Sequence, residues 1–305
     1  MRYYLYSAGL IIIAIIVTTF TPFFLEEVDF RIISIQIPEN SSNVAGIQKF
    51  TSPPVSKGQV APETSARSIL VLDLATGKSL FEKQADQKLP IASTTKIMTA
   101  LVANSYFKPG STLTVGDGAS VVGSKVGLKT GESLTFRSLL YGLLLNSGND
   151  AAFVIAENYP GGILGFVTSM NKKVYEMELK NTHFENPAGL DSLNHYSSAR
   201  DLSRITEEAL KDYQLARIFA TKDTEITTLD KKYTYKLHNI NKLLSSVVGV
   251  LGVKTGYSEN AKENLIALVD RGGKRVLLVL LGSDDRFGET TKLIDWTYSN
   301  FLWQN

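Results

Sequence analysis

Patterns typical of strands stand at both ends of residues 65–305, with patterns typical of helices between them, and this order limits the fold more than any other feature of the chain. Expected helices lie near residues 93–106, 136–145, 151–157, 164–177, 199–213 and 290–301, and expected strands at 68–73, 79–82, 225–228, 233–237, 250–256, 264–270 and 274–281. The first strands share one core with the last only if they pair across the helical segment. The order therefore predicts an α/β (α+β) fold in which an antiparallel sheet, its first strands beside its last, is flanked by helices on both faces.

A long apolar segment precedes this domain. Residues 3–25 carry no charge, follow Arg2 and precede Glu26 and Glu27. At about 1.5 Å per helical residue, they can cross the roughly 30 Å of membrane hydrocarbon. The positive charge before the span favours an N-terminus inside and the remaining chain outside. Because no small-x-small cleavage site follows, we expect an uncleaved N-terminal transmembrane helix, with cleavage of a signal peptide and secretion as the alternative.

The chain is expected to divide into three parts. Residues 1–25 form the membrane anchor or signal segment, and residues 26–64 are rich in Ser, Pro, Asn and Gly, which is typical of a linker. Residues 65–305 have the apolar content and the size of one continuous domain. The linker would set a variable distance between the domain and the membrane surface.

Composition excludes several classes of protein. The chain has no cysteine, which excludes disulfides, thiolate nucleophiles and cysteine-based zinc sites. It has only 3 histidines, and its formal net charge of +2 does not provide the basic field of a nucleic-acid binder. We therefore expect no metal and no nucleic-acid partner, and any covalent catalysis must use an oxygen or nitrogen nucleophile.

A serine and a lysine stand three residues apart where a helix is expected to begin. Ser93 and Lys96 would project from one helical face. A serine hydroxyl is a weak nucleophile, and a lysine serves as its base once burial and neighbouring positive charge lower its pKa. The free N–H groups of a helix N-terminus would stabilise an oxyanion. Because serine is also a common N-cap, the pair alone is only a candidate nucleophile and base.

A second pair of polar residues lies in the short connection between two expected helices. Ser147 and Asn149 stand two residues apart there, so that both side chains can reach one cleft. The hydroxyl is suited to relaying a proton, and the amide to holding a substrate carbonyl.

A third motif ends an expected strand. Lys254 and Thr255 offer a cation and a hydroxyl to a substrate carboxylate, and Gly256 lets a ligand lie close along the strand edge. The backbone N–H of Tyr257 is a candidate second oxyanion donor, opposite that of Ser93.

The three motifs follow the order of the signature motifs of penicillin-recognising serine enzymes. With the longer segments 90–100, 143–152, 182–190, 195–202 and 241–244, the chain resembles the D-alanyl-D-alanine carboxypeptidase family of low-molecular-mass penicillin-binding proteins over about residues 68–301. The resemblance implies a β-lactamase/transpeptidase-like fold. It also implies a bacterial cell-membrane serine DD-peptidase whose extracytoplasmic domain trims peptidoglycan stem peptides ending in D-Ala-D-Ala and takes β-lactams as covalent inhibitors. No cofactor is implied.

The resemblance also implies a role for each motif residue. Ser93 would attack the D-Ala–D-Ala carbonyl, Lys96 would take its proton, and Ser147 with Lys254 would pass a proton to the leaving amine. Water would then release the acyl-enzyme.

The remaining implied residues bind substrate. Asn149 would hold the peptide, and Lys254 and Thr255 the terminal carboxylate. Arg286 aligns with an arginine that the family places near that carboxylate, although a surface role is an equal alternative.

Two residues depart from the family pattern. Lys262 stands where glycine is usual, which predicts a reshaped cleft rim. Ala188 stands where His or Thr is common, in the part of the chain that borders the outer substrate subsite.

Three other residues resemble functional groups but are interpreted as structural. The Lys-Thr-Gly sequence at Lys129 repeats the letters of the third motif, yet it precedes Ser147 and is expected to form a turn. His183 and His195 lack the acidic partner of a Ser-His-Asp arrangement, so we expect them to order loops.

Three alternative functions remain open at this stage. A DD-endopeptidase that cuts crosslinks would use the same residues. A β-lactamase of this type needs a glutamate in a Glu-x-x-Leu-Asn context, and Glu176 comes close but lacks the Asn. A catalytically inactive wall-binding protein would have lost a motif residue, and none is lost.

Overall fold

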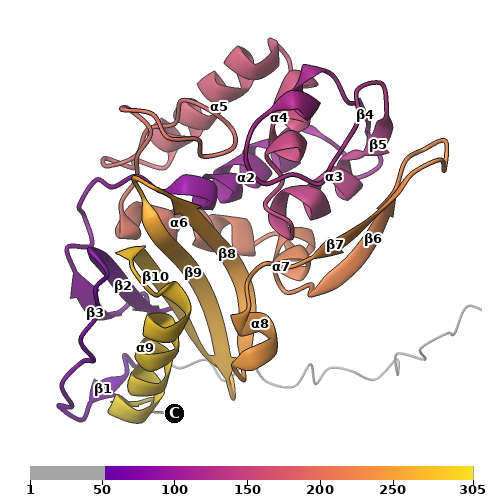
Figure 1. The fold of residues 1–305 in the computed structure, drawn as a ribbon. Coiled ribbons are helices and arrows are strands. Elements are labelled where there is room, and N and C mark those ends of the chain that lie inside the picture. The colour runs from indigo at the N-terminus through magenta and orange to yellow at the C-terminus, as the bar shows by residue number, and fades with distance from the viewer. Residues whose placement is uncertain (1–51, 305) are drawn as a thin grey trace, which may run out of the picture. The chain divides into compact units, whose positions relative to one another are not determined.

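The computed structural model describes residues 52–304 of the chain. Its centre is a five-stranded antiparallel sheet with the strand order β3-β2-β10-β9-β8 (Figure 1). In that order the strands span Ser79–Lys83, Ser68–Asp73, Lys274–Ser283, Lys262–Arg271 and Val250–Ser258. The first strands of the domain therefore lie beside the last ones, as the order of the patterns predicted.

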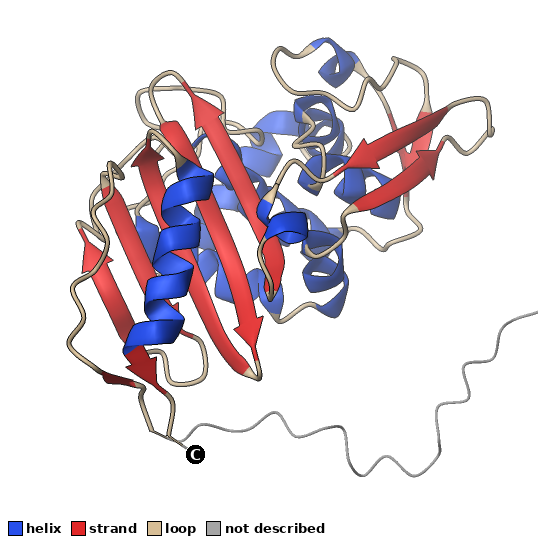
Figure 2. Cartoon of the chain, turned by 60° about the horizontal axis from the view of Figure 1, so that its bottom comes forward, coloured by secondary structure: helices blue, strands red, loops and turns tan. Residues whose placement is uncertain are grey.

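Helices cover both faces of this sheet, which confirms the expected layers (Figure 2). Along β2, Ile69 and Val71 belong to the apolar cluster beneath α9 (Arg286–Asn300), whereas Leu70 and Leu72 belong to the cluster beneath the other helices. A strand buried on both faces has no polar alternation, and this explains the unbroken apolar run of β10.

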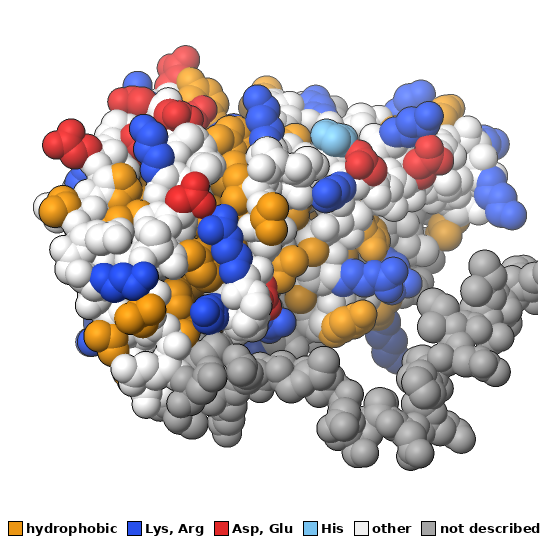
Figure 3. All heavy atoms as spheres, turned by 90° about the horizontal axis from the view of Figure 1, so that it is seen from below, with side chains coloured by type: hydrophobic (Ala, Val, Ile, Leu, Met, Phe, Trp, Pro, Cys, Tyr) orange, Lys and Arg blue, Asp and Glu red, His pale blue; other side chains and the backbone are white. Residues whose placement is uncertain are grey.

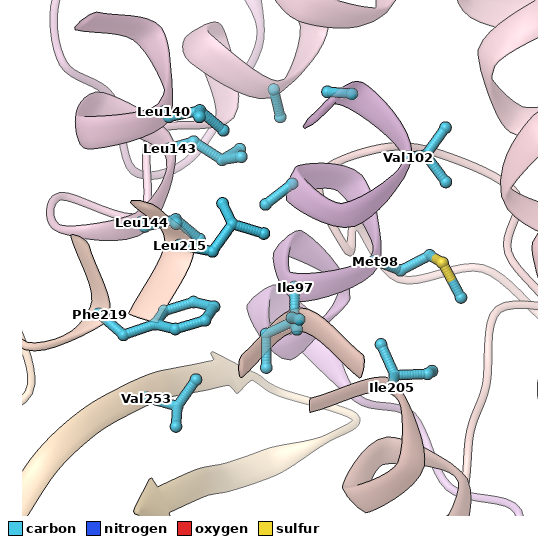
Figure 4. Packing of buried hydrophobic residues seen from close by; sticks show 14 of the residues in the cluster. Ile97, Met98, Val102, Leu140, Leu143, Leu144, Ile205, Leu215, Phe219 and Val253 are labelled. Carbon is cyan, nitrogen blue, oxygen red and sulfur yellow. The ribbon is translucent and has the colours of Figure 1, made fainter. Parts of the chain in front are cut away.

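The helices on the face of the sheet opposite α9 are arranged around α2, which begins at Lys96 of the first motif. They are η1 (Ala92–Thr95), α2 (Lys96–Tyr106), α3 (Phe136–Leu144), α4 (Asn149–Glu157), α5 (Gly162–Glu176), α6 (Ala199–Leu210) and α7 (Tyr213–Phe219). Figure 4 shows Ile97, Met98 and Val102 of α2 among apolar side chains of α3, α6, α7 and β8. Because α2 is enclosed in this way, the side chain that begins it is removed from water.

The helix expected over residues 199–213 forms as α6 but ends at Leu210, and the separate helix α7, Tyr213–Phe219, was not predicted. Asp212 separates α6 from α7, and its carboxylate accepts the N–H of Leu215 at 2.9 Å. An aspartate that caps a new helix in this way competes with continuation of the previous one. The apolar spacing runs on across the break, which is why spacing alone did not reveal it.

Several short elements complete the domain. They are the pair β4 (Thr112–Thr114) and β5 (Ser133–Thr135), the 3-10 turn η2 (Asp117–Ser120), the hairpin of β6 (Asp223–Thr227) and β7 (Thr234–His238), and α8 (Leu243–Ser246). The two strands β6 and β7 were expected, and they form a two-stranded sheet separate from the central one. The others are too short for a hydrophobic period to identify them.

A short strand pair joins the two ends of the described chain. β1 (Val55–Ser56) pairs with β11 (Phe301–Leu302), and the N–H of Lys57 donates to the carbonyl of Asn300 at 2.8 Å. This pairing attaches the end of the expected linker to the domain. The expected membrane span, residues 3–25, and residues 26–51 lie outside the described residues. Within residues 52–304, no helix has the length and apolar character needed to cross a membrane.

Charged side chains of both signs are distributed over the surface. On the face shown in Figure 3, Lys and Arg side chains are interspersed with Asp and Glu and with scattered apolar groups. Some form exposed ion pairs, such as those of Arg200 with Glu82 and Asp86. This face differs from the continuous basic stripe that nucleic-acid binders present.

Candidate active site

Ser93 lies in the tight turn η1, directly before α2 and against β8. Its side chain is partly exposed, whereas neighbouring side chains of the turn are buried. A Cβ on Gly256 of β8 would lie 3.0 Å from the carbonyl oxygen of Ile91 and 3.1 Å from the amide nitrogen of Ser93. Because glycine has no Cβ, it allows the strand to approach the serine amide this closely.

The strand β8 forms one edge of the sheet, and it continues to Ser258, beyond the expected end of the strand. An edge strand leaves backbone groups free to pair with an extended peptide. Tyr257 follows Gly256 on this edge, and its side chain is 62% exposed. The backbone N–H groups of Ser93 and Tyr257 therefore remain the candidate oxyanion donors.

Lys96 is 0% exposed and its Nζ has three hydrogen-bond partners. The partners are the Oγ of Ser93 at 2.9 Å, the Oδ1 of Asn149 at 2.7 Å and the carbonyl of Ala188 at 2.6 Å. Burial holds the pKa of Lys96 well below its usual range, and the positive charge of Lys254 lowers it further. Lys254 thus lies within electrostatic reach of Lys96, which brings the first and third motifs together.

The three partners determine where the lone pair of a neutral Lys96 points. The amide oxygen of Asn149 and the carbonyl of Ala188 can only accept, so each must receive an N–H of the amine. The hydroxyl of Ser93 is the one partner that can donate. The neutral amine therefore directs its lone pair to Ser93, which is the geometry that a general base requires.

Asn149 has a positioning role that the sequence did not reveal. Its Nδ2 donates to the carbonyl of Val122 at 2.7 Å, which fixes the amide orientation and turns Oδ1 to Lys96. Its backbone N–H donates to the carbonyl of Ser124 at 2.7 Å. The loop that contains Val122 and Ser124 therefore sets the orientation of Asn149.

The adjacent Asp150 holds the same loop. Its carboxylate accepts the N–H groups of Val126, Gly127 and Leu128 at 3.0, 2.8 and 3.1 Å, and its side chain is 0% exposed. Buried negative charge with several backbone donors is a stable arrangement. The charge of Asp150 opposes part of the downward pKa shift of Lys96.

Ser147 lies on the connection between α3 and α4, as predicted. Its φ of 58° is uncommon for a residue other than glycine, and its side chain is 2% exposed. Hydrogen bonds of the residues before and after Ser147 fix the connection. The N–H of Gly148 donates to the carbonyl of Gly142 at 3.0 Å, and the Oδ1 of Asn146 accepts the N–H of His238 at 3.0 Å. A constrained backbone of this kind is typical of functional loops.

Lys254, Thr255 and Arg286 provide hydrogen-bond donors on and beside β8, where the Nζ of Lys254 donates to the carbonyl of Thr255 at 3.1 Å. Burial lowers the pKa of Lys254 from its usual 10.5 to about 7, and the charge of Arg286 adds to the shift. Arg286 donates its Nη1 to the carbonyl of Gly256 at 2.9 Å, so it lies at the site and not in a remote surface position. Among the described residues, the buried Oγ1 of Thr255 and Nε of Arg286 have no hydrogen-bond partner.

The donor set determines which ligand suits the site. Buried polar atoms are nearly always paired, so unpaired donors next to two lysines indicate the place of an anionic ligand. The functional side chains at the site are those of two lysines, one arginine, three hydroxyl residues and one asparagine. A carboxylate suits this set better than a metal ion, which prefers imidazole, thiolate or carboxylate ligands.

Two lysines outside the motifs lie where sequence reasoning placed them. Lys129 is in a turn in which the N–H of Glu132 donates to its carbonyl at 3.1 Å, and its Nζ lies 4.3 Å from the ring centre of Tyr233. The third-motif letters at Lys129 are therefore structural. Lys262 is exposed at the start of β9, opposite Ser258 on β8.

Sequence reasoning did not find the part that Ala188 plays. Its carbonyl receives an N–H of Lys96, and the preceding carbonyl of Pro187 accepts from Thr99 at 2.6 Å. Backbone carbonyls have no residue-specific signal, so no motif could have identified them. The only available signal was the surrounding Asn-Pro-x-Gly-Leu segment.

The fold and these contacts define a class of enzyme. The site combines a partly exposed serine, a buried lysine placed to accept its proton, and a cationic subsite on a sheet edge. This combination is typical of a serine acyl-transfer enzyme that uses lysine as its base.

Comparison with known proteins narrows this class to a family. The family model described as D-alanyl-D-alanine carboxypeptidase matches residues 55–285. A D-alanyl-D-alanine carboxypeptidase of Bacillus subtilis is 37% identical over 246 residues, which cover 77% of this chain and 63% of the relative. The chain therefore spans less than two thirds of that relative's length. It belongs to the D-alanyl-D-alanine carboxypeptidase family.

Two further relatives extend the comparison. A D-alanyl-D-alanine endopeptidase of Pseudomonas aeruginosa is 31% identical over 88% of this chain and 86% of its own length. The crystal structure of a Streptomyces DD-transpeptidase superimposes with a TM-score of 0.74 at 32% identity, over 79% of this chain and 100% of that one. This likeness confirms the transpeptidase-like fold expected from the resemblance.

Proposed function

We propose that the chain is a serine-type D-Ala-D-Ala carboxypeptidase that trims peptidoglycan stem peptides through an acyl-enzyme on Ser93. The observation that carries this proposal is the set of contacts around Lys96, which leaves its lone pair for the hydroxyl of Ser93. Family membership supplies the substrate class.

The acylation step follows from the geometry. The Oγ of Ser93 bonds to the carbonyl carbon of the penultimate D-Ala while its proton passes to the Nζ of Lys96. The negative charge that forms on the carbonyl oxygen is held by the N–H groups of Ser93 and Tyr257. The C–N bond then breaks, and the leaving D-Ala amine receives a proton through Ser147.

The terminal carboxylate of the substrate occupies the subsite of unpaired donors. Lys254 provides charge, Thr255 a hydroxyl and Arg286 a guanidinium, and Asn149 also contacts the peptide. The second half of the reaction is attack by water on the ester of Ser93, with Lys96 taking a proton from the water. This releases the shortened peptide and restores the serine.

An endopeptidase activity on crosslinks is the second candidate. The Pseudomonas relative carries that name, and its amino-acid leaving group would also present a carboxylate to the Lys254 subsite. A β-lactamase activity is less well supported. Glu176, a partial match to the required glutamate, pairs with Lys172 and Lys173 on the surface of α5.

The test of the proposed function uses the full-length chain in detergent with a diacylated L-Lys-D-Ala-D-Ala peptide and, separately, a crosslinked dimeric stem peptide. We expect release of free D-Ala from the first and none with Ser93→Ala. Cleavage of the dimer alone would replace the proposal by the endopeptidase. A stable mass adduct with benzylpenicillin, absent in Ser93→Ala, would identify the acylated serine, and no adduct with no hydrolysis would favour an inactive binder.

For location, we propose that residues 3–25 anchor the chain in the bacterial cell membrane with the domain outside the cytoplasm. The uncharged length of the segment and Arg2 before it support this. Because the chain has no cysteine, Ser41→Cys provides a single label in the linker. A membrane-impermeant maleimide should label it in intact cells, and labelling only after lysis would contradict the proposal.

A further inference from the structure

His195 is buried directly behind the turn that carries the nucleophile. Its side chain is 4% exposed, and its Nε2 lies 2.8 Å from the Oγ1 of Thr95. On the other side of the ring, Nδ1 accepts the backbone N–H of Glu185 at 3.1 Å. Thr95 is the second residue after Ser93, so the imidazole contacts the turn of the first motif.

The direction of these hydrogen bonds follows from the groups involved. The N–H of Glu185 can only donate, so Nδ1 has no proton and a neutral ring carries its proton on Nε2. Nε2 therefore donates to the Oγ1 of Thr95. The hydroxyl proton of Thr95 is then directed to the carbonyl oxygen of Ala92, 2.8 Å away.

The surroundings keep the ring of His195 neutral. Burial lowers its pKa from 6.5 to about 4, and the charges of His183 and Lys96 act in the same direction. The charges of Glu185 and Asp191 oppose this shift without reversing it. A protonated ring would place a second N–H against that of Glu185, so the relay exists only in the neutral form.

The carbonyl at the end of this relay shares its peptide unit with the oxyanion donor. In a planar trans peptide the C=O and the following N–H point in opposite directions. Fixing the carbonyl of Ala92 behind the turn therefore turns the N–H of Ser93 towards β8. Ala92 needs such support, since its φ of 45° is unfavourable for a residue other than glycine.

The backbone of Gly189 packs closely against this carbonyl and limits the space around it. A Cβ on Gly189 would lie 1.9 Å from the oxygen of Ala92 and 2.8 Å from the Oγ1 of Thr95. Gly189 also belongs to the turn organised by Asn186, whose Oδ1 accepts the N–H of Ala188 at 3.1 Å and that of Gly189 at 2.8 Å.

We propose that His195 is a positioning residue for the oxyanion hole, which orients the N–H of Ser93 through Thr95 and the carbonyl of Ala92. The inference rests on the acyl-enzyme chemistry proposed above. It assigns His195 a part in the reaction rate in addition to the loop-ordering role expected from sequence.

Matched variants of the full-length chain test the relay. His195→Asn keeps an acceptor for the N–H of Glu185 but is too short to reach Thr95, whereas His195→Gln keeps a donor at the position of Nε2. We expect His195→Asn and Thr95→Val each to lower the acylation rate constant of Ser93 by about ten- to hundredfold, because a misdirected oxyanion donor loses part of its effect. His195→Gln should recover most of the rate.

The double variant separates positioning from general destabilisation. If both residues act through one relay, His195→Asn with Thr95→Val should be no slower than the slower single variant, whereas independent effects would multiply. His183→Asn, a change at another histidine of the same loop, should keep the wild-type rate. Melting temperatures show which variants are folded, and Thr95→Val alone still tests the relay if His195→Asn does not fold.

The outcomes distinguish this inference from the proposed function. Folded His195→Asn or Thr95→Val with the wild-type acylation rate, or multiplicative effects in the double variant, would overturn the positioning role. A wild-type chain that is not acylated would instead contradict the proposed function itself.

Discussion

The Oδ1 of Asn149 accepts a hydrogen bond from the Nζ of Lys96 at 2.7 Å, and this contact joins the first and second motifs of the site. It occupies one N–H of the lysine and so contributes to directing the lone pair to Ser93. A residue expected from sequence only to hold substrate therefore also orients the base. The carbonyl of Val122 fixes the orientation of this amide by accepting from its Nδ2.

Replacing this amide by a carboxylate should leave less of Lys96 in the neutral form that acts as the base. Asn149→Asp places a negative charge beside Lys96, which raises the pKa of the lysine and leaves it protonated at neutral pH. We expect the acylation rate at pH 7 to fall about tenfold or more and the acidic limb of the rate profile to move to higher pH. Asn260→Asp, which adds the same charge at an exposed turn, should leave the profile in place.

The pKa of Lys254 predicts how substrate affinity depends on pH. Below about 7 its ammonium is charged and attracts the substrate carboxylate, and above that pH the charge is lost. The KM for a D-Ala-D-Ala peptide should therefore rise as the pH increases through 7, by up to about tenfold per unit. Lys254→Arg, which stays charged, should show a KM that is flat over this range, and a rising KM in that variant would exclude Lys254 as the cause.

Burial of the Lys254 side chain should also lower the free energy of unfolding in a pH-dependent way. The folded pKa of Lys254 is about 7 and its ordinary value is 10.5, so between these pH values the unfolded chain binds more protons than the folded one. The free energy of unfolding should therefore increase with pH across this window. Lys254→Met removes the charge, and we expect a melting temperature raised by a few degrees at pH 7, less so at pH 10, with peptidase activity lost. Equal shifts at the two pH values would contradict this explanation.

The close approach of β8 to the nucleophile predicts a strict requirement for glycine. In Gly256→Ala the new Cβ meets the carbonyl of Ile91 and the amide of Ser93 at 3.0 and 3.1 Å, which are backbone atoms that cannot rotate away. We expect acylation to fall at least a hundredfold in a folded protein, measured by intact mass after addition of a β-lactam. Gly110→Ala, at a position with no atom within 4 Å of the added Cβ, provides the control.

Local sequence determined much of the fold and part of the site. Three-residue spacing on one helical face brings Ser93 to Lys96, and a short connection between helices holds Ser147 next to Asn149. The order of strand and helix patterns was sufficient to place the first strands beside the last and helices on both faces. These features depend on residue spacing and on the need to bury apolar faces, and both can be read along the chain.

The tertiary structure alone decided how these residues react. The carbonyls of Ala188 and Val122, which aim Lys96 and Asn149, come from segments distant in sequence and have no side-chain signature. The lowered pKa of Lys96 results from its removal from water at the centre of the helical layer and from the charge of Lys254 on the opposite strand. Because desolvation and charge proximity depend on three-dimensional distance, the sequence predicts the nucleophile and its base, whereas the packing of remote segments keeps the lysine neutral and correctly aimed.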